Sequence, residues 1–441
     1  MMDEMKQWLC LFFCLWCFFC SEVQNIFVVA KGEGTFLSSS KSNKNVFSCD
    51  SKQYPKQGQI SPLIIPEKIA SLEWTGKPEE NGGSAPNVFA LTLNDNGYPG
   101  GKPWRSNSEG KADSWRDITD DLRQAIPPDS RKDAEVGVVA VHQSRADENY
   151  VFLQGSGKWH WGSTDGGLHF EAISSPGQIA GIRHVLKLHP RQASWILMRT
   201  ERDICKSDRW SMECSFDLFV TRDFGKNWKN LTSHCHGNFD GIKDFDWGAS
   251  ISKFFGRSTK DEDIFVTAYP GDAAKKGLEP GWDARLQFLF SDDLFSSSPK
   301  MTVQCGNIFE IISDKLFLAI PSDCPVGPDG KPRKAGKGTI AGRSVTMYVS
   351  SDGSDFVEAC LPADLEDDGY NLIHTHDRYG AFVLADHAEP GSRGPSLDSP
   401  TADAYAPAYN ASLHTLSLEQ VYRRSYIPDF GRIEGVPVSF F

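Results

Sequence analysis

The stretches Ser163-Thr-Asp165-Gly-Gly167-Leu-His-Phe170 and Thr221-Arg-Asp223-Phe-Gly225-Lys-Asn-Trp228 follow one pattern. Each has a hydroxyl residue first, Asp third, Gly fifth and an aromatic residue eighth. The Asp carboxylate accepts hydrogen bonds from backbone N–H groups just beyond it, and Gly supplies the positive φ that closes the bend. The aromatic residue then folds back under the turn. The pattern therefore predicts β-hairpins in which Asp holds a turn and does not perform chemistry.

Degenerate copies of this turn indicate a repeat. Ser291-Asp-Asp293 has Phe295 at the glycine position, and Ser350-Ser-Asp352-Gly-Ser-Asp-Phe356 is one residue short. A weaker candidate, Ser106-Asn-Ser108-Glu-Gly110, precedes Trp115. Copies recur roughly every sixty residues, which suits four short strands and their connections. Four apolar stretches precede the clearer copies and are expected strands: residues 158–161, 217–220, 286–290 and 345–349.

The composition agrees with an all-β protein. The chain has 12% aromatic residues, 39 Gly and 25 Pro, as expected for many short strands and turns. Only residues 117–125 suggest a short helix. The net charge of −12 argues against nucleic acid as a partner. We expect a β-propeller of four-stranded antiparallel blades in a single extended domain.

The strand, Asp turn and aromatic residue together constitute the Asp-box, which occurs in sialidase-like and sortilin-like β-propellers. The segments around the turns resemble blades of the sortilin family of sorting receptors. The resemblance begins near residue 138, with a less certain first blade from about residue 70, and reaches the end of the chain. It rests on residues 217–231, Phe245-Asp-Trp-Gly248, and residues 289–295, 316–319, 347–352, 359–362, 413–419 and 429–435.

The resemblance implies a ten-bladed propeller followed by a small cysteine-rich module, a membrane helix and a cytosolic tail. About six blades fit this chain, so we expect an incomplete propeller. The chain stops in Val436-Pro-Val-Ser-Phe-Phe441, which resembles the start of another blade and suggests a fragment or a truncated gene model. We predict a signal peptide at 1–20, an approach segment at 21–70 and a partial propeller at 71–441. The expected blades are 71–135, 136–185, 186–245, 246–310, 311–365 and 366–441.

The N-terminus and the cysteines indicate export. Residues 8–20 are thirteen apolar residues, long enough for a secretory signal and too short to span a bilayer. The alternatives are an uncleaved anchor or an incorrect start codon. No run of eighteen apolar residues follows.

Seven of the eleven cysteines lie beyond that segment, which is an odd number. Cys205–Cys214 and Cys305–Cys324 are candidate disulfides, although spacing alone does not determine connectivity. Asn230-Leu-Thr232 and Asn410-Ala-Ser412 are N-glycosylation sequons.

The family resemblance implies a binding function. A lumenal propeller would capture protein or peptide cargo and route it among Golgi, endosome and vacuole-like compartments. Contacts with the membrane and with cytosolic adaptors would need segments absent from this chain. In the family, an arginine begins the strand that leads to the turn at Asp352. The matching position here is Val345, and the nearest arginine, Arg343, is the candidate ligand-binding residue.

The alternative is a sialidase-like glycoside hydrolase, because such enzymes also carry Asp-boxes. That chemistry needs an arginine cluster and a Tyr/Glu pair. No Phe-Arg-Ile-Pro-like segment begins such a cluster, and Asp261-Glu-Asp263 and residues 364–368 have the polar surroundings of solvated loops. His234-Cys-His236 and His374-Thr-His376-Asp377 have metal-ligand types but lack further ligands at fitting spacing. We therefore predict no enzyme activity, no metal and no cofactor.

Overall fold

A computed structural model of the chain describes residues 65–76, 87–177, 185–202, 216–233, 239–270, 286–312, 314–332, 344–353, 355–361, 365–366, 370–374, 381–385, 401–407, 412–424 and 427–428. The chain divides into two compact units, Met1–Thr119 and Asp120–Phe441. No helix in these ranges is long and apolar enough to cross a membrane. The predicted signal peptide lies outside the described residues.

The first unit contains one four-stranded antiparallel sheet. Its order is β1-β2-β3-β4, so strands adjacent in sequence are adjacent in space. Val88, Phe89 and Ala90 in the second strand are fully buried. Such an apolar run is typical of a strand covered on both faces. The elements are β1 (Ile69–Thr75), β2 (Asn87–Thr92), β3 (Trp104–Ser106), the 3-10 helix η2 (Ala112–Ser114) and β4 (Trp115–Asp117).

Two short helices connect this sheet to the next. The helix α2 (Thr119–Ala125) lies within the range expected to be helical, and α3 (Pro128–Arg131) follows it. Asp117 Oδ1 accepts a hydrogen bond from Thr119 N (2.8 Å), which satisfies an N–H group that has no partner within the helix. Leu122 is buried, and its carbonyl accepts a hydrogen bond from Trp161 Nε1 (2.8 Å). The helix α2 is thereby attached to the following sheet.

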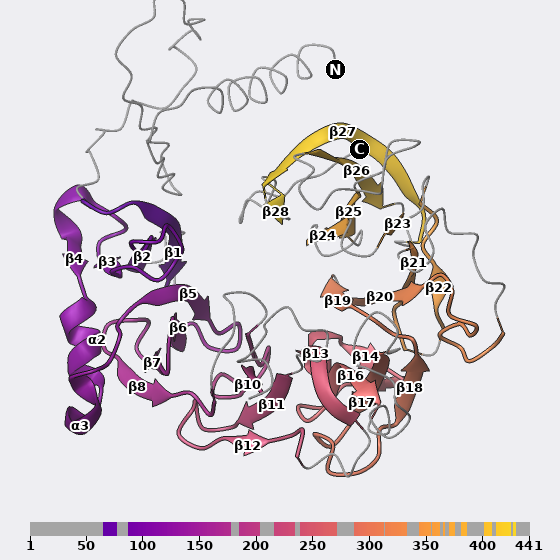
Figure 1. The fold of residues 1–441 in the computed structure, drawn as a ribbon, viewed down its shortest axis with the longest axis horizontal. Coiled ribbons are helices and arrows are strands. Elements are labelled where there is room, and N and C mark those ends of the chain that lie inside the picture. Colours follow the sequence, from indigo (N-terminus) through magenta and orange to yellow (C-terminus); the bar gives the residue numbers. More distant parts are fainter. Residues whose placement is uncertain are drawn as a thin grey trace, which may run out of the picture. The chain divides into compact units, whose positions relative to one another are not determined.

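The second unit repeats the same four-strand pattern along the chain (Figure 1). A single pairing, Phe216 with Ile242, joins its second and third sheets. The first two sheets are β5 (Val138–Gln143), β6 (Val151–Gly155), β7 (Trp159–Ser163) and β8 (Glu171–Ser174), then β9 (Leu186–Leu188), β10 (Ile196–Glu201), β11 (Phe216–Thr221) and β12 (Lys229–Asn230). The next two are β13 (Phe239–Trp247), β16 (Ile264–Pro270), β17 (Gln287–Ser291) and β18 (Met301–Gln304), then β19 (Phe309–Ile312), β20 (Lys315–Pro321), β21 (Ser344–Ser350) and β22 (Val357–Glu358). The last is β24 (Tyr370–His374), β25 (Ala381–Ala385), β26 (Thr401–Pro407), β27 (His414–Arg424) and β28 (Ile427–Pro428).

Several smaller elements accompany these sheets. The 3-10 helix η4 (Gly248–Ser250) and the hairpin of β14 (Lys253–Phe254) with β15 (Arg257–Ser258) lie between β13 and β16. The short strand β23 (Leu365–Glu366) pairs with β21.

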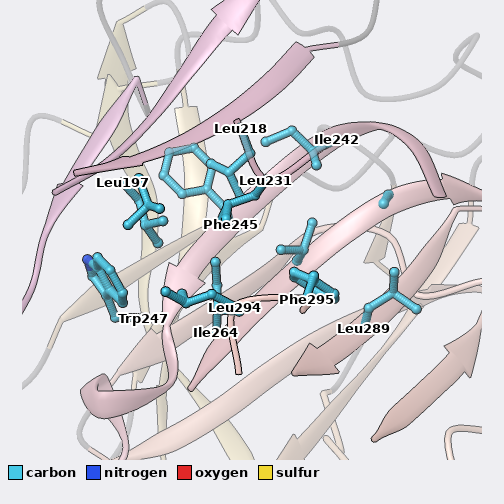
Figure 2. Packing of buried hydrophobic residues seen from close by; sticks show 13 residues of the cluster. Leu197, Leu218, Leu231, Ile242, Phe245, Trp247, Ile264, Leu289, Leu294 and Phe295 are labelled. Carbon is cyan, nitrogen blue, oxygen red and sulfur yellow. The ribbon is translucent and has the colours of Figure 1, made fainter. Parts of the chain in front are cut away.

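The hydrophobic core lies between successive sheets. One cluster combines Leu197 and Leu218 of the second sheet with Phe245, Trp247 and other residues of the third, as Figure 2 shows. Burying each large apolar side chain contributes roughly 1.5–3 kcal/mol. This packing of one sheet face on the next is how propeller blades stabilise each other.

With the two halves of the eight-stranded sheet counted separately and the β14–β15 hairpin left out, the described strands form six blades. The fold is an incomplete all-β propeller of antiparallel, mainly four-stranded blades. The four stretches expected to be strands lie mainly in β7, β11, β17 and β21. The expected boundary between the third and fourth repeats, at residues 245 and 246, differs from the structure. The strand β13 crosses that boundary, and its pairing of Trp247 with Ile264 places it in the later sheet. The expected boundary between residues 310 and 311 also differs, because β19 crosses it and its pairing of Phe309 with Leu318 places it in the later sheet.

Candidate ligand-binding site

The turn after β7 is closed by its own side chains. Ser163 Oγ donates to Asp165 Oδ1 (2.7 Å) and accepts from Gly167 N (2.9 Å). Asp165 Oδ1 also accepts from Leu168 N and His169 N, both at 3.0 Å. Partial burial alone would raise the pKa of Asp165, but the hydrogen bonds from His169, Ser163 and Leu168 together lower this pKa to about 2. The carboxylate is ionised and is used within its own turn.

The turn after β11 has the same arrangement. Thr221 Oγ1 donates to Asp223 Oδ1 (2.8 Å) and accepts from Gly225 N (3.0 Å), whose φ is 87°. Asn227 donates to Asp223 through its backbone N (2.9 Å) and its Nδ2 (2.7 Å). A Cβ on Gly225 would lie 2.5 Å from Ile173 Cγ2 of the preceding sheet. Glycine is therefore needed both for the turn and for contact between sheets.

The turn after β17 keeps this geometry without glycine. Ser291 Oγ donates to Asp293 Oδ1 (2.9 Å) and accepts from Phe295 N (2.8 Å). Phe295 adopts a φ of 56°, which costs a non-glycine residue roughly 1–2 kcal/mol. Its side chain is fully buried in the cluster of Figure 2, and that burial offsets the backbone cost.

The two remaining candidates also form closed turns. Gly353 N donates to Ser350 Oγ (2.8 Å), and Gly353 has a φ of 76°. In this shorter copy, the glycine follows the hydroxyl residue one position earlier than in the longer copies. Ser350 Oγ lies 3.4 Å from Asp352 Oδ1. In the first unit, Gly110 N donates to Ser106 Oγ (2.9 Å). All five turns therefore share the hydroxyl acceptor, and their geometry supports a structural role.

A different set of polar residues lies on the strands that begin three successive sheets. We call Lys187 of β9, Asp244 and Asp246 of β13 and Glu310 of β19 the inner-strand cluster. Lys187 Nζ lies 3.0 Å from Asp246 Oδ2, although the two residues are 59 positions apart in sequence. Lys187 also interacts electrostatically with Asp244 and Glu310. In a propeller, sheets surround a central channel, and strands at one end of each sheet face it.

The surroundings of this cluster change its protonation. Burial raises the pKa of Asp244 to about 6 and that of Glu310 to about 7, and the nearby Lys187 opposes both shifts without cancelling them. Asp246 is the main cause of a raised pKa at Lys187, which therefore stays protonated. Two carboxyl groups consequently change charge between pH 5 and 8.

Chemically, this arrangement favours a cationic ligand group. Three carboxyl groups interact with the ammonium group of Lys187, and the guanidinium group of Arg199 also acts on Asp244. One negative charge is then left when all three carboxyl groups are ionised, and a lysine, arginine or amine from a ligand would balance it. Within the described parts of the chain, no group of three or more His, Cys, Asp or Glu side chains is arranged to hold a metal ion.

Sequence reasoning missed the inner-strand cluster. Asp244-Phe-Asp-Trp247 alternates acidic and aromatic residues, and in a strand such alternation puts the two kinds on opposite faces. Phe245 and Trp247 are buried in the core. This alternation is the signal by which the sequence could have revealed Asp244 and Asp246. It does not show that Lys187 and Glu310 lie near them.

The structure brings together some predicted site residues. Cys305 and Cys324 form a disulfide that connects the end of β18 to the segment after β20. Asn230 lies at the end of β12, and its Oδ1 accepts a hydrogen bond from Ser233 N (2.9 Å). Val345, which the resemblance matches to the family's arginine, is buried in the core between the last two sheets. Several predicted residues lie outside the described residues: Cys205, Cys214, His234, His236, Arg343, His376 and Asn410.

Comparison with known proteins gives the family. The family model described as "Sortilin, neurotensin receptor 3" matches residues 101–437. The chain belongs to the sortilin family. The vacuolar protein sorting/targeting protein 10 of Aspergillus flavus is 24% identical over 314 residues, which cover 69% of this chain and 18% of that protein. The protein of that name in Leptosphaeria maculans is 21% identical over 318 residues, with the same shares. This sortilin-family chain thus spans under a fifth of the length of these relatives.

The solved structures to which this chain is similar are more distant in sequence. The GH74 xyloglucanase from Xanthomonas campestris is 14% identical with a TM-score of 0.41, and the match covers 76% of this chain and 43% of that one. The β-propeller domain of the Trilobed protease from Pyrococcus furiosus is 11% identical with a TM-score of 0.35, covering 77% and 82%. These similarities are too low to support any conclusion about this sortilin-family chain.

Proposed function

We propose that this chain is the ligand-binding portion of a sorting receptor in the lumen of the secretory pathway. It captures protein or peptide cargo for transport among Golgi, endosomes and vacuole-like compartments. Family membership supports this proposal, as do relatives named for vacuolar protein sorting. No membrane attachment, adaptor binding, catalytic step or cofactor is proposed for the described residues.

The inner-strand cluster is the group of residues that we propose binds the cargo. Its three carboxyl groups come from two sheets, so a single ligand group inserted there contacts both. Lys187 neutralises only part of their charge, because it forms its salt bridge with Asp246. A lysine or arginine of the cargo would therefore gain favourable electrostatic interactions with Asp244 and Glu310.

Binding of short peptides to the immobilised chain tests this assignment. A lysine-rich peptide should bind at pH 7.4, and a glutamate-rich peptide of equal length should not. Glu310→Gln should weaken lysine-peptide binding several-fold. Glu358→Gln is the matched control, because Glu358 is exposed on β22, the last strand of the same sheet. Equal affinity for both peptides, or an unaffected Glu310→Gln variant, would contradict the proposed site.

A glycoside hydrolase is the second candidate, because Glu310 has the raised pKa that a general acid requires. The discriminating assay is incubation of the chain with fluorogenic sialosides and glucosides. Turnover that disappears in Glu310→Gln would favour the enzyme. We expect no turnover from the wild-type chain.

Two further assignments follow from the same proposal. Arg343 is proposed as a contact for a ligand carboxylate, and Arg343→Ala should weaken binding of a peptide with a free C-terminus but not of its amidated form. Asn230 and Asn410 are proposed glycan sites. Removal of N-glycans from the secreted chain should lower its mass, and Asn→Gln at both positions should abolish that change.

A further inference from the structure

A groove of about 990 Å³ lies between the first and second sheets of the second unit. One wall is β8, the last strand of its sheet, and the other is the aspartate turn after β11. Residues that line it include Glu171, Ala172, Ser174, Phe224, Lys226 and Trp228. Its volume is at the upper end of the range for ligand pockets, roughly 300–1,000 Å³. It involves none of the residues of the inner-strand cluster.

The wall formed by β8 presents backbone groups that pair with no other described strand. Ser175 N donates to Lys158 O (2.8 Å), which continues the ladder between β7 and β8. In an antiparallel ladder, alternate residues direct their N–H and C=O groups toward the partner strand. Ala172 and Ser174 therefore direct theirs away from β7, and both residues line the groove. An edge of this kind can pair with an added strand.

The base of the groove is rigid and apolar. A Cβ on Gly162 would lie 2.6 Å from the Phe224 ring and 2.8 Å from Ile173 Cδ1, so these residues are closely packed. Tyr150 contacts Phe224 edge to face, with ring centroids 5.0 Å apart. A bound segment would thus rest on a preformed surface, and it would not need to open the contact between the two sheets.

Charges at the rim determine which segment fits. Among the described residues, the carboxylates of Asp165, Glu171 and Asp223 line the groove together with the ammonium group of Lys226. His169 also lines it, and its Nδ1 lies 2.6 Å from Asp165 Oδ2. The excess of negative charge is complementary to a basic partner.

We propose that this groove binds an extended peptide segment whose aliphatic centre is flanked by lysine or arginine residues. The segment adds to the edge of β8 as a further strand, so that backbone hydrogen bonds to Ala172 and Ser174 supply affinity. Its aliphatic side chains pack on Phe224 and Trp228, and its basic ends approach the rim carboxylates. This gives the chain a second binding surface, on the outer strands, beyond the proposed cargo site.

Fluorescence polarisation with a labelled Lys-Lys-Val-Ala-Val-Lys-Lys peptide tests the proposal. The probe should bind the full chain. A Glu-Glu-Val-Ala-Val-Glu-Glu peptide should bind at least tenfold more weakly, because its charges repel the rim. Methylation of the three central amides of the lysine peptide should also raise Kd about tenfold or more, because it removes the donors that pair with β8. Equal binding of the methylated peptide would overturn strand addition.

Variants locate the binding surface. Ala172→Pro removes one outward N–H group and should raise Kd about tenfold, whereas Ala172→Val keeps that donor and should change Kd little. Glu171→Lys reverses an exposed rim charge and should raise Kd several-fold. Ala172→Pro and Glu171→Lys are also measured in the Glu310→Gln background, where binding to the inner-strand cluster is weakened, and each should raise Kd there as well. Unchanged probe binding when Ala172→Pro and Glu171→Lys are added to Glu310→Gln would place the peptide in the channel and overturn the proposal. If Ala172→Pro fails to fold, the Glu171→Lys variant and the methylated peptide still decide the question.

Discussion

Phe295 shows how a repeat tolerates the loss of its most constrained residue. The glycine position of the turn requires a positive φ, and Phe295 adopts 56° there. The ring is buried among Leu294, Leu289 and Phe245, so burial of the ring offsets the backbone cost. The hydroxyl of Ser291 still accepts the backbone N–H, which keeps the turn closed. The hydrogen bond, and not the glycine, is thus the shared feature of these turns.

At Gly225 no such compensation is available. We expect Gly225→Ala to lower the free energy of unfolding by roughly 1–3 kcal/mol, because the new Cβ meets Ile173 at 2.5 Å and the φ of 87° disfavours alanine. Urea denaturation of the purified chain measures the change. The control is Gly157→Ala, where a Cβ meets no atom within 4 Å and no positive φ is present. Similar losses in both variants would contradict this explanation.

At the scale of single elements, the strand β19 carries Glu310, and burial disfavours the charged form of this carboxyl group at neutral pH. The pKa of Glu310 in the folded chain is about 7, above its ordinary value of 4.5. The folded chain therefore binds this proton more tightly than the unfolded chain does. The contribution of Glu310 to stability is fully present below about pH 4.5 and is lost as pH rises through 7.

We expect Glu310→Gln to raise the free energy of unfolding at pH 8 by about 1–3 kcal/mol relative to wild type, with little difference at pH 4.5. Denaturant titrations at several pH values measure this difference. Glu358→Gln, on the exposed last strand of the same sheet, should show no such pH dependence. A Glu310→Gln variant that is less stable than wild type at pH 8 would show that the charged form is favoured in the folded chain.

The disulfide acts between elements, because it joins the end of β18 to the segment after β20. Closing a loop of 19 residues contributes roughly 3 kcal/mol by constraining the unfolded chain. Replacing both Cys305 and Cys324 by Ser should therefore lower the melting temperature by several degrees. Cys360→Ser is the control, since Cys360 is an exposed free thiol. A reducing agent should lower the melting temperature of wild type by at least as much, and it should lower that of the double variant by less.

For the whole molecule, the proposed binding function has a defined pH dependence. Asp244 and Glu310 lose their negative charges as pH falls through about 6 and about 7. We expect affinity for a lysine-rich peptide to fall about tenfold or more from pH 7.4 to pH 5.5, because the attraction to the cationic group is lost. Surface plasmon resonance across this range measures it. The Asp244→Asn and Glu310→Gln double variant should bind weakly at both pH values, and a full pH dependence in that variant would contradict the assignment.

Much of the fold was predictable because its main signals are local. The hydrogen bonds of Ser163 with Asp165 and Gly167 lie within one turn, so the residue pattern specifies them directly. The preceding strands were recognisable from their apolar runs. The blade boundary near residue 245 was not, because β13 could pair with either neighbouring sheet until its ladder with β16 was seen.

The sequence by itself determined the repeated turns, the all-β class and the family resemblance, since each depends on residues a few positions apart. The tertiary structure alone decided the salt bridge of Lys187 with Asp246, the raised pKa of Glu310 and the groove beside β8. These features join residues from different sheets, or depend on how deeply packing buries a charge. Their energies are therefore determined by distances in space, which no local pattern encodes.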